Sequence, residues 1–131
     1  MARIFLGYHS SLVGTRLCEM IAELDGVDLT GVVFESDKLE HSLDSASPDI
    51  AILDIRLLIA SRIGGMNRLK TRYPATQFIL LYDHPYNQYS RECKRLGAEY
   101  CLDTLHQFAD IGTLIADYNR GYRRAGRILP S

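Results

Sequence analysis

The chain has 131 residues, the size of one domain, and its 47% hydrophobic and 24% charged residues are typical of a globular protein. Fifteen basic and sixteen acidic residues leave a formal charge of -1, so no global field attracts nucleic acid or a membrane surface. These values exclude a disordered chain, a collagen-like fibre and a coiled coil. The apolar runs are too short for a membrane span or a signal peptide. We therefore expect a cytoplasmic protein.

The chain has three cysteines, Cys18, Cys93 and Cys101. Their number is odd and no two have the C-x-x-C spacing, which argues against a secreted disulfide framework and a zinc knuckle. We expect three reduced thiols that serve as small apolar groups.

Short apolar runs alternate with helical patterns in the first third of the chain. A strand is predicted over residues 3–7, and apolar residues at helical spacing predict a helix over residues 11–24. Gly26 favours the end of that helix. A second strand is predicted over residues 27–34. Asp37 and Glu40 have the spacing of a capping box for a short helix that ends before Pro48.

The same alternation continues to the end of the chain. Residues 49–54 are apolar up to Asp54, as expected of a parallel strand buried on both faces. One helix is predicted over residues 59–73, although Gly64 and Gly65 each weaken it by about 1 kcal/mol relative to Ala. A strand over residues 77–82, a helix ended by Gly97, a strand over residues 98–102 and a last helix follow. The apolar stripes of these two helices contain Tyr86, Tyr89, Cys93 and Leu96, and Phe108, Ile111, Ile115, Tyr118 and Tyr122.

Five strands alternating with five helices predict an α/β fold in three layers, with a parallel sheet and right-handed crossovers. In such sheets the functional crevice lies outside the carboxyl ends of the strands. The first strand-to-helix turn lacks G-x-G-x-x-G, so a dinucleotide site is not expected. The polar residues predicted at this edge are Tyr8, His9, Ser10, Asp54, Tyr82, Asp83, Asp103 and Thr104.

Four segments, at residues 49–57, 69–74, 78–81 and 97–100, together resemble the receiver domain of bacterial two-component response regulators. Asp54 ends the third strand like the phosphorylated aspartate of that family. The resemblance covers about residues 2–119 and implies a flavodoxin-like (β/α)5 fold with strand order 2-1-3-4-5. It also implies one receiver-like domain over residues 1–131 that signals with a histidine kinase or another regulatory protein. Residues 120–131 form its basic end.

The chemical positions of the family are altered here. Tyr8 and His9 stand where two acidic residues hold Mg²⁺, Tyr82 and Asp83 replace a hydroxyl residue and a small residue, and Thr104 replaces a lysine. Mg²⁺ needs carboxylate ligands, and phosphoryl transfer needs positive charge. Among these replacements only His9 can become cationic. We therefore expect weak or no Mg²⁺ binding, no cofactor, no enzymatic activity and an atypical receiver that acts mainly through protein contacts.

Alternative functions remain open. Asp54 could be a true phosphoacceptor in a phosphorelay, or the domain could bind a cofactor or an anion as flavodoxin-like proteins do. His9 and Ser10 precede a helix N-terminus, where backbone amides favour an anion. A purely structural Asp54 would bond to loop amides or pair with His9. Thr104 and Gln107 have the spacing of a capping box for the last helix.

The resemblance also suggests a contact face on the fourth helix, fifth strand and last helix, through which the domain could form a homodimer. Aromatic residues and arginine are enriched at interface hot spots, and this face carries Tyr89, Tyr100, Tyr118 and Tyr122. The chain ends with four arginines, Arg120, Arg123, Arg124 and Arg127. Cations are favoured at a helix C-terminus, which explains this cluster better than nucleic-acid binding does.

Overall fold

The computed structural model describes residues 1–83 and 87–121, without the side chains of Asn87 and Gln88. It has five strands and six α-helices in this part of the chain. In chain order they are β1 (Ala2–Gly7), α1 (Ser11–Ala22), β2 (Val27–Val33), α2 (Leu39–Ala46), β3 (Ile50–Asp54), α3 (Ile55–Ser61), α4 (Met66–Arg72), β4 (Gln77–Tyr82), α5 (Asn87–Arg95), β5 (Tyr100–Asp103) and α6 (Phe108–Asn119).

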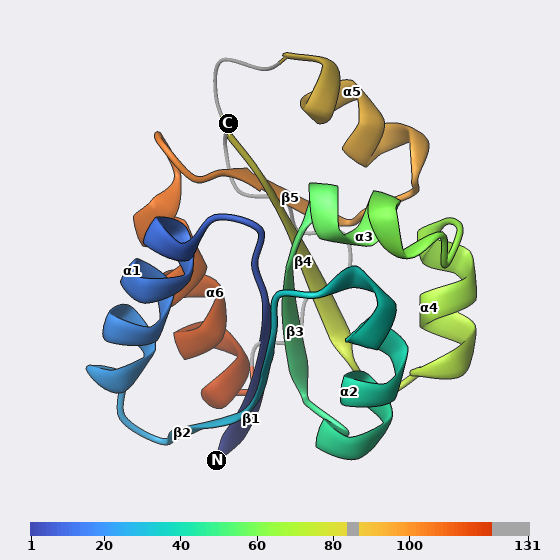
Figure 1. Cartoon of the computed structure of the whole chain (residues 1–131). Helices are drawn as coiled ribbons and strands as arrows, with labels where there is room; N and C mark the ends of the chain where they lie inside the picture. The colour runs from blue at the N-terminus through green and yellow to red at the C-terminus, as the bar shows by residue number, and fades with distance from the viewer. Residues whose placement is uncertain (84–86, 122–131) are drawn as a thin grey trace.

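The strands form one parallel sheet in the order β2-β1-β3-β4-β5. Helices α1 and α6 cover one face of the sheet, and α2, α3 and α4 cover the other (Figure 1). The predicted three-layer α/β/α architecture and the flavodoxin-like order 2-1-3-4-5 are therefore confirmed. No helix among the described residues is long and apolar enough to span a membrane.

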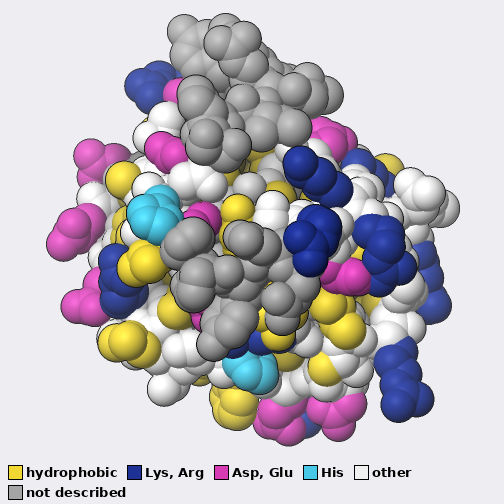
Figure 2. All heavy atoms as spheres, turned by 90° about the horizontal axis from the view of Figure 1, so that it is seen from above, with side chains coloured by type: hydrophobic (Ala, Val, Ile, Leu, Met, Phe, Trp, Pro, Cys, Tyr) yellow, Lys and Arg dark blue, Asp and Glu magenta, His cyan; other side chains and the backbone are white. Residues whose placement is uncertain are grey.

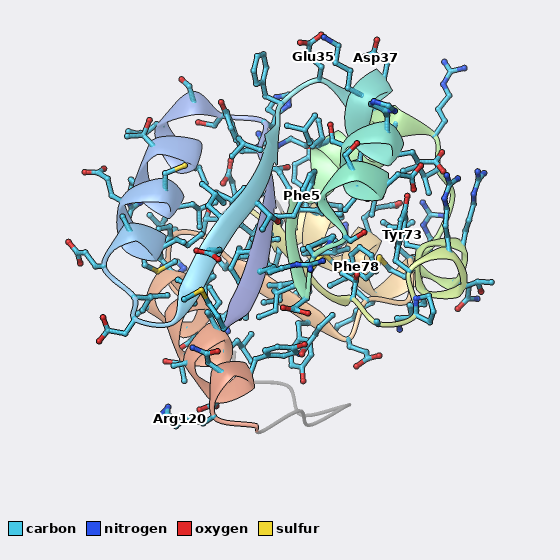
Figure 3. All side chains as sticks on the ribbon, turned by 90° about the horizontal axis from the view of Figure 1, so that it is seen from below. Phe5, Glu35, Asp37, Tyr73, Phe78 and Arg120 are labelled. Carbon is cyan, nitrogen blue, oxygen red and sulfur yellow. A yellow bond between two sulfur atoms is a disulfide. The ribbon has the colours of Figure 1, made fainter. Side chains whose placement is uncertain are left out.

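The sheet separates two apolar cores. Phe5 and Leu53 belong to the core under α2–α5, whereas Leu6 and Ile52 belong to the core under α1 and α6. All five residues of β3 are buried, as the unbroken apolar run predicted. Seen from below, Phe5 lies between the sheet and α2 (Figure 3). Asp54, the last residue of β3, is therefore held by a strand packed on both faces.

The helix predicted over residues 59–73 is wrong, because two short helices replace it. The first, α3, begins directly after Asp54, and the break between α3 and α4 contains Arg62 and Gly64, both with positive φ (58° and 101°). Positive φ is readily adopted by glycine and ends a helix. The Met66 amide at the start of α4 donates to the Leu96 carbonyl (2.9 Å), which fixes where the second helix begins.

The capping box predicted at Asp37 and Glu40 is also wrong. Asp37 lies inside a 3-10 turn over Ser36–Lys38. Helix α2 then begins after Lys38, without a side-chain capping hydrogen bond. Its apolar stripe is nevertheless in place, because Leu39 and Leu43 are fully buried.

The expectation of three reduced thiols is wrong for two of the cysteines. Cys93 of α5 and Cys101 of β5 form a disulfide, and Cys18 is the free cysteine. Their Cα atoms are 6.3 Å apart, within the range that a disulfide requires. Packing of α5 on β5 brings together two cysteines that are eight positions apart in the sequence. The test for C-x-x-C spacing could not detect this pair.

A polar clamp joins α2 to the end of α4. Arg72 binds Glu40 (2.6 Å) and Asp44 (2.7 Å), and the Tyr73 hydroxyl donates to Asp44 (2.6 Å). Burial, together with the hydrogen bond to the Asp44 carboxylate, raises the pKa of Tyr73 to about 12. Tyr73 and Phe78 lie together on this side of the sheet (Figure 3), with ring centroids 6.4 Å apart.

The Tyr73 hydrogen bond predicts a pH-dependent stability. Between pH 10 and about 12 the unfolded chain has lost the Tyr73 proton while the folded chain retains it, so stability falls as pH rises through this window. Because the ring is partly exposed, we expect Tyr73→Phe to cost only about 1 kcal/mol at neutral pH. Urea unfolding of both proteins should show this difference shrinking between pH 10 and pH 12. A constant difference would contradict the assignment.

Candidate functional site

The carboxyl ends of the strands meet at one edge of the sheet, where the sequence places its candidate site. Figure 2 shows this side of the molecule, where apolar side chains lie among basic and acidic ones. Asp54 ends β3, Asp83 follows β4, and Thr104 follows β5. The structure brings these three side chains into one hydrogen-bonded cluster, and Arg56 links the two carboxylates.

Arg56 bonds to both carboxylates. Its Nε and Nη2 donate to Asp54 Oδ1 (3.2 Å) and Oδ2 (3.0 Å), and Nη2 also donates to Asp83 Oδ2 (2.7 Å). The exposed fractions of the Asp54, Arg56 and Asp83 side chains are 3%, 22% and 26%. The hydrogen bond to Asp54, with the charges of Asp54 and Asp83, raises the pKa of Arg56. The guanidinium is therefore a permanent cation between two acids.

Thr104 completes the cluster from β5. Its hydroxyl donates to Asp83 Oδ1 (2.6 Å), and its amide donates to the Tyr82 carbonyl (2.9 Å). The predicted capping role of Thr104 is therefore wrong: Gln107 is the N-cap of α6 and makes no side-chain capping hydrogen bond. We refer to Asp54, Arg56, Asp83 and Thr104 as the Arg56 cluster.

Local geometry explains why Arg56 folds back onto Asp54. Asp54 is the N-cap of α3, and its Oδ1 accepts the Arg56 amide (2.8 Å). This bond places the Arg56 side chain, two residues along the chain, within reach of the same carboxylate. A cation is unfavourable in the first turn of a helix unless acids compensate it, and Asp54 and Asp83 do so here. Sequence reasoning missed Arg56, although an arginine two residues after a strand-ending aspartate was the available signal.

The structural role expected for Asp54 was a bond to loop amides or a pair with His9. The amide that Asp54 accepts belongs instead to Arg56 in the first turn of α3, and the charge partner is also Arg56 and not His9. His9 is exposed, and Ser10 stands at the N-cap of α1 without a side-chain capping hydrogen bond. Tyr82 is partly buried and packs against the core under α2–α5.

Tyr8 packs over α1. Its ring lies 5.8 Å from the ring of Phe34, centroid to centroid, and covers Gly14. A Cβ atom at Gly14 would stand 2.7 Å from the Tyr8 ring. The position of the Tyr8 ring thus depends on a glycine in the facing helix.

This contact predicts a sign reversal in stability. In the wild-type background Gly14→Ala should cost about 1 kcal/mol, because the overpacked Tyr8 ring outweighs the gain in helix propensity. In a Tyr8→Ala background the same substitution should stabilise the protein by about 0.5–1 kcal/mol. Thermal and urea unfolding of the four proteins would measure both values. The same sign in both backgrounds would refute the contact.

A second acidic group lies next to the Arg56 cluster. Asp103 Oδ1 accepts the Leu105 amide (2.8 Å), and Oδ2 lies 2.8 Å from His106 Nδ1. Gln107 Oε1 accepts the Asp103 amide (3.1 Å). Asp103, rather than Thr104, therefore holds the turn that precedes α6, and His106 is a bonded side chain and not merely a solvated one.

The described part of the chain offers little for a site elsewhere in the fold. It contains no group of three or more His, Cys, Asp or Glu side chains placed to hold a metal ion. A hollow of about 390 Å³ lies at the opposite end of the sheet, where β4 begins. Its rim includes Tyr73, Tyr118 and the ion pair Lys70–Glu99 (3.1 Å). None of the residues predicted at the carboxyl edge lines it.

Solved structures to which this chain is similar include receiver domains of response regulators. The receiver domain of a NarL regulator from Mycobacterium tuberculosis is 18% identical, with a TM-score of 0.71 over 92% of this chain and 97% of that one. The isolated receiver domain of RcsB from Salmonella enterica serovar Typhimurium, with the phosphomimetic BeF3-, is 15% identical (TM-score 0.72, 92% and 89% coverage). A LuxR-family response regulator from Aurantimonas sp. SI85-9A1 is 17% identical (TM-score 0.73, 98% and 89%).

At these identities the likeness establishes the fold. No family model matches the sequence, and no curated protein matches it. The structure thus confirms the receiver-like fold predicted from the four sequence segments. The function of the chain is inferred from the Arg56 cluster.

Proposed function

We propose that this chain is a degenerate receiver domain in bacterial two-component signalling, which acts through protein contacts and not through phosphorylation of Asp54. The observation that carries the proposal is the placement of Arg56 between Asp54 and Asp83. The receiver domains to which the chain is similar supply the signalling context. A histidine kinase or another regulatory protein in the cytoplasm is the proposed partner.

The residues at this edge do not fit Mg²⁺. The ion requires oxygen ligands, of which carboxylates supply the charge. Here the carboxylates of Asp54 and Asp83 already bind a guanidinium, and Tyr8 packs over α1. A divalent cation would have to displace Arg56 from both carboxylates, and the two positions that follow β1 carry a phenol and an imidazole, which supply no further carboxylate ligand. Arg56 thus takes over the charge compensation that a metal would otherwise supply.

Phosphorylation of Asp54 is opposed by the same contacts. Asp54 Oδ1 accepts the Arg56 amide and Nε, and Oδ2 accepts Nη2. Attack on a phosphoryl donor would have to release the guanidinium from the attacking oxygen. No lysine follows β5 to stabilise the transferred group, and Asp83 adds negative charge. Preorganised positive charge is usually the largest catalytic contribution to such reactions, so we expect Asp54 to remain unmodified.

Exposed apolar side chains near this edge support a role in protein contacts. Leu12 opens α1, Phe34 follows β2 and Leu105 follows β5, with exposed fractions of 70%, 60% and 64%. Apolar residues that gather at functional loops are typical of partner-binding surfaces. The partner would therefore bind these side chains at the carboxyl edge and would not require a phosphoryl group on Asp54.

The contact face proposed on α5, β5 and α6 has a smaller aromatic surface than its sequence predicts. Tyr100 is buried, and Tyr89 and Tyr118 are partly buried. Tyr122 lies outside the described residues. A homodimer through this face remains a proposal that concentration-dependent sizing can test: a mass that stays monomeric at every concentration would contradict it.

Intact mass spectrometry after incubation with Mg²⁺ and an acyl-phosphate donor tests the proposed function. We expect no phosphoryl adduct on the wild-type chain. A multiple variant, with Tyr8→Glu, His9→Asp, Arg56→Met, Tyr82→Thr, Asp83→Ala and Thr104→Lys, restores the acids and the lysine and removes Arg56. This variant should gain one phosphoryl group.

The matched control adds Asp54→Asn to the multiple variant and should abolish the adduct. A wild-type adduct that is lost in the single variant Asp54→Asn would overturn the proposal and favour a phosphorelay function. Circular dichroism of each variant establishes that it is folded before its mass is compared.

A further inference from the structure

The Cys93–Cys101 disulfide links a helix to the edge of the sheet. It joins α5 to the last strand, β5, which forms one edge of the sheet. Cys93 is fully buried, whereas Cys101 is partly exposed. In a cytoplasmic protein, as the proposed function has it, stable disulfides are rare and the usual ones are transient or redox-sensing.

Few other apolar groups hold α5 against the sheet. Among the described side chains of this helix Cys93 is the only buried one, and Tyr89 is partly buried. The remaining described side chains are polar. The backbone at the end of the helix is tied by the hydrogen bonds from Ala98 N to Cys93 O (3.2 Å) and from Met66 N to Leu96 O (2.9 Å). The disulfide is thus a main anchor of α5.

The same helix touches the Arg56 cluster. The Tyr89 ring lies 6.0 Å from Arg56 Cζ, a distance at which a guanidinium is attracted to an aromatic ring. Asp83, whose carboxylate binds Arg56, is separated from the start of α5 by only three residues. A change in the position of α5 therefore acts on the cluster through the contact of Tyr89 with Arg56.

We propose that Cys93 and Cys101 form a reversible thiol–disulfide site whose redox state controls the contact between α5 and the Arg56 cluster. The co-reactant is a low-molecular-weight thiol such as glutathione. Its thiolate attacks the sulfur of Cys101, the less buried residue of the pair, forming a mixed disulfide and releasing Cys93 as a thiolate that takes a proton from water. A second thiolate attacks the outer sulfur, which releases Cys101 and the oxidised low-molecular-weight disulfide. Two electrons and two protons are transferred in total.

The cytoplasmic location and the use of the Arg56 cluster in this inference rest on the proposed function, but the thiol–disulfide exchange itself can be measured without it. The test equilibrates the full chain with mixtures of reduced and oxidised glutathione, denatures it in alkylating reagent and measures intact mass. We expect one alkylated cysteine, Cys18, in the oxidised mixture and three in the reduced one. Three alkylated cysteines in every mixture, or one in every mixture, would overturn the proposal.

Hydrogen exchange of the two forms tests the structural consequence. Reduction should make the α5 amides exchange about tenfold faster and should also accelerate the Arg56 amide, which is bonded to Asp54. The α1 amides should not change. In the Tyr89→Leu variant reduction should still loosen α5, but the response of the Arg56 amide should be diminished. Cys93→Ala/Cys101→Ala should exchange like the reduced form in both mixtures.

These results separate the two proposals. The redox coupling would be overturned if the α5 amides of the wild-type chain exchanged at the same rate in both redox states. It would also be overturned if the exchange rate of the Arg56 amide stayed the same when reduction loosened α5. Phosphorylation of Asp54 in both redox states would overturn the proposed function and would leave the thiol count and the α5 exchange unaffected.

Discussion

Arg56→Met should lower the free energy of unfolding by about 3 kcal/mol, because it leaves the buried carboxylate of Asp54 without its charge partner. The carboxylate keeps the amide at position 56 but loses the bonds to Nε and Nη2. Asp83 is also left with the Thr104 hydroxyl as its remaining partner in the cluster. Urea unfolding monitored by circular dichroism measures the loss.

A double variant shows whether the loss comes from the uncompensated charge. Asp54→Asn/Arg56→Met removes both charges, and we expect it to lie within about 1.5 kcal/mol of the wild type. Arg68→Met is the matched control, because Arg68 pairs with Glu40 while largely exposed to water. It should cost less than about 0.5 kcal/mol. If Arg56→Met costs no more than Arg68→Met, the Arg56 cluster has no energetic importance.

Reduction of the Cys93–Cys101 disulfide should lower the free energy of unfolding by about 2.5 kcal/mol, because a cross-link of this loop length restricts the unfolded chain. The two cysteines are eight residues apart. Since reduction leaves the sequence unchanged, the comparison is free of the cavities that a substitution would introduce. Urea unfolding with and without reductant measures the difference.

Two variants serve as controls for the reductant. Cys18→Ala should respond to the reductant like the wild type, because Cys18 is not part of the bond. Cys93→Ala/Cys101→Ala should not respond at all. A wild-type chain that unfolds at the same urea concentration in both conditions would show that the bond does not form in solution.

The sheet was predictable because its strands are short runs separated by helical patterns, and β1, β3 and β4 are apolar and largely buried. β4 spans the residues that the apolar run predicted, and β3 begins one residue later than predicted. Parallel pairing of these strands requires crossovers, which fixed the architecture. The carboxyl ends of the strands then had to lie at one edge, so Asp54, Asp83 and Thr104 could be grouped from the sequence.

The partners of these side chains could not be predicted in the same way. Arg56 interacts with Asp54 two residues earlier and with Asp83 twenty-seven residues later, and the conformation of a long side chain leaves no periodic signal. Tyr8 was expected beside Asp54, but the small surface of Gly14 accommodates its ring on α1. Thr104 was expected to cap α6, but its hydroxyl donates instead to the carboxylate of Asp83.

The break between α3 and α4 shows the limit of helical periodicity. The apolar spacing continues through Ile63 and Met66, both of which are buried, so the pattern predicts one helix. The two glycines identified the weak point, but the position of the break depends on the tertiary hydrogen bond from Met66 to Leu96. A helix that begins directly at Asp54 is what brings Arg56 within reach of the carboxylate.

The most direct test of the central claim is a crystal structure of the wild-type chain soaked in Mg²⁺ and beryllium fluoride. We predict that the electron density shows Arg56 between Asp54 and Asp83, with neither a tetrahedral group on Asp54 nor an octahedral ion beside it. A beryllium fluoride bonded to Asp54 next to a bound Mg²⁺, with Arg56 displaced from the carboxylates, would contradict the account.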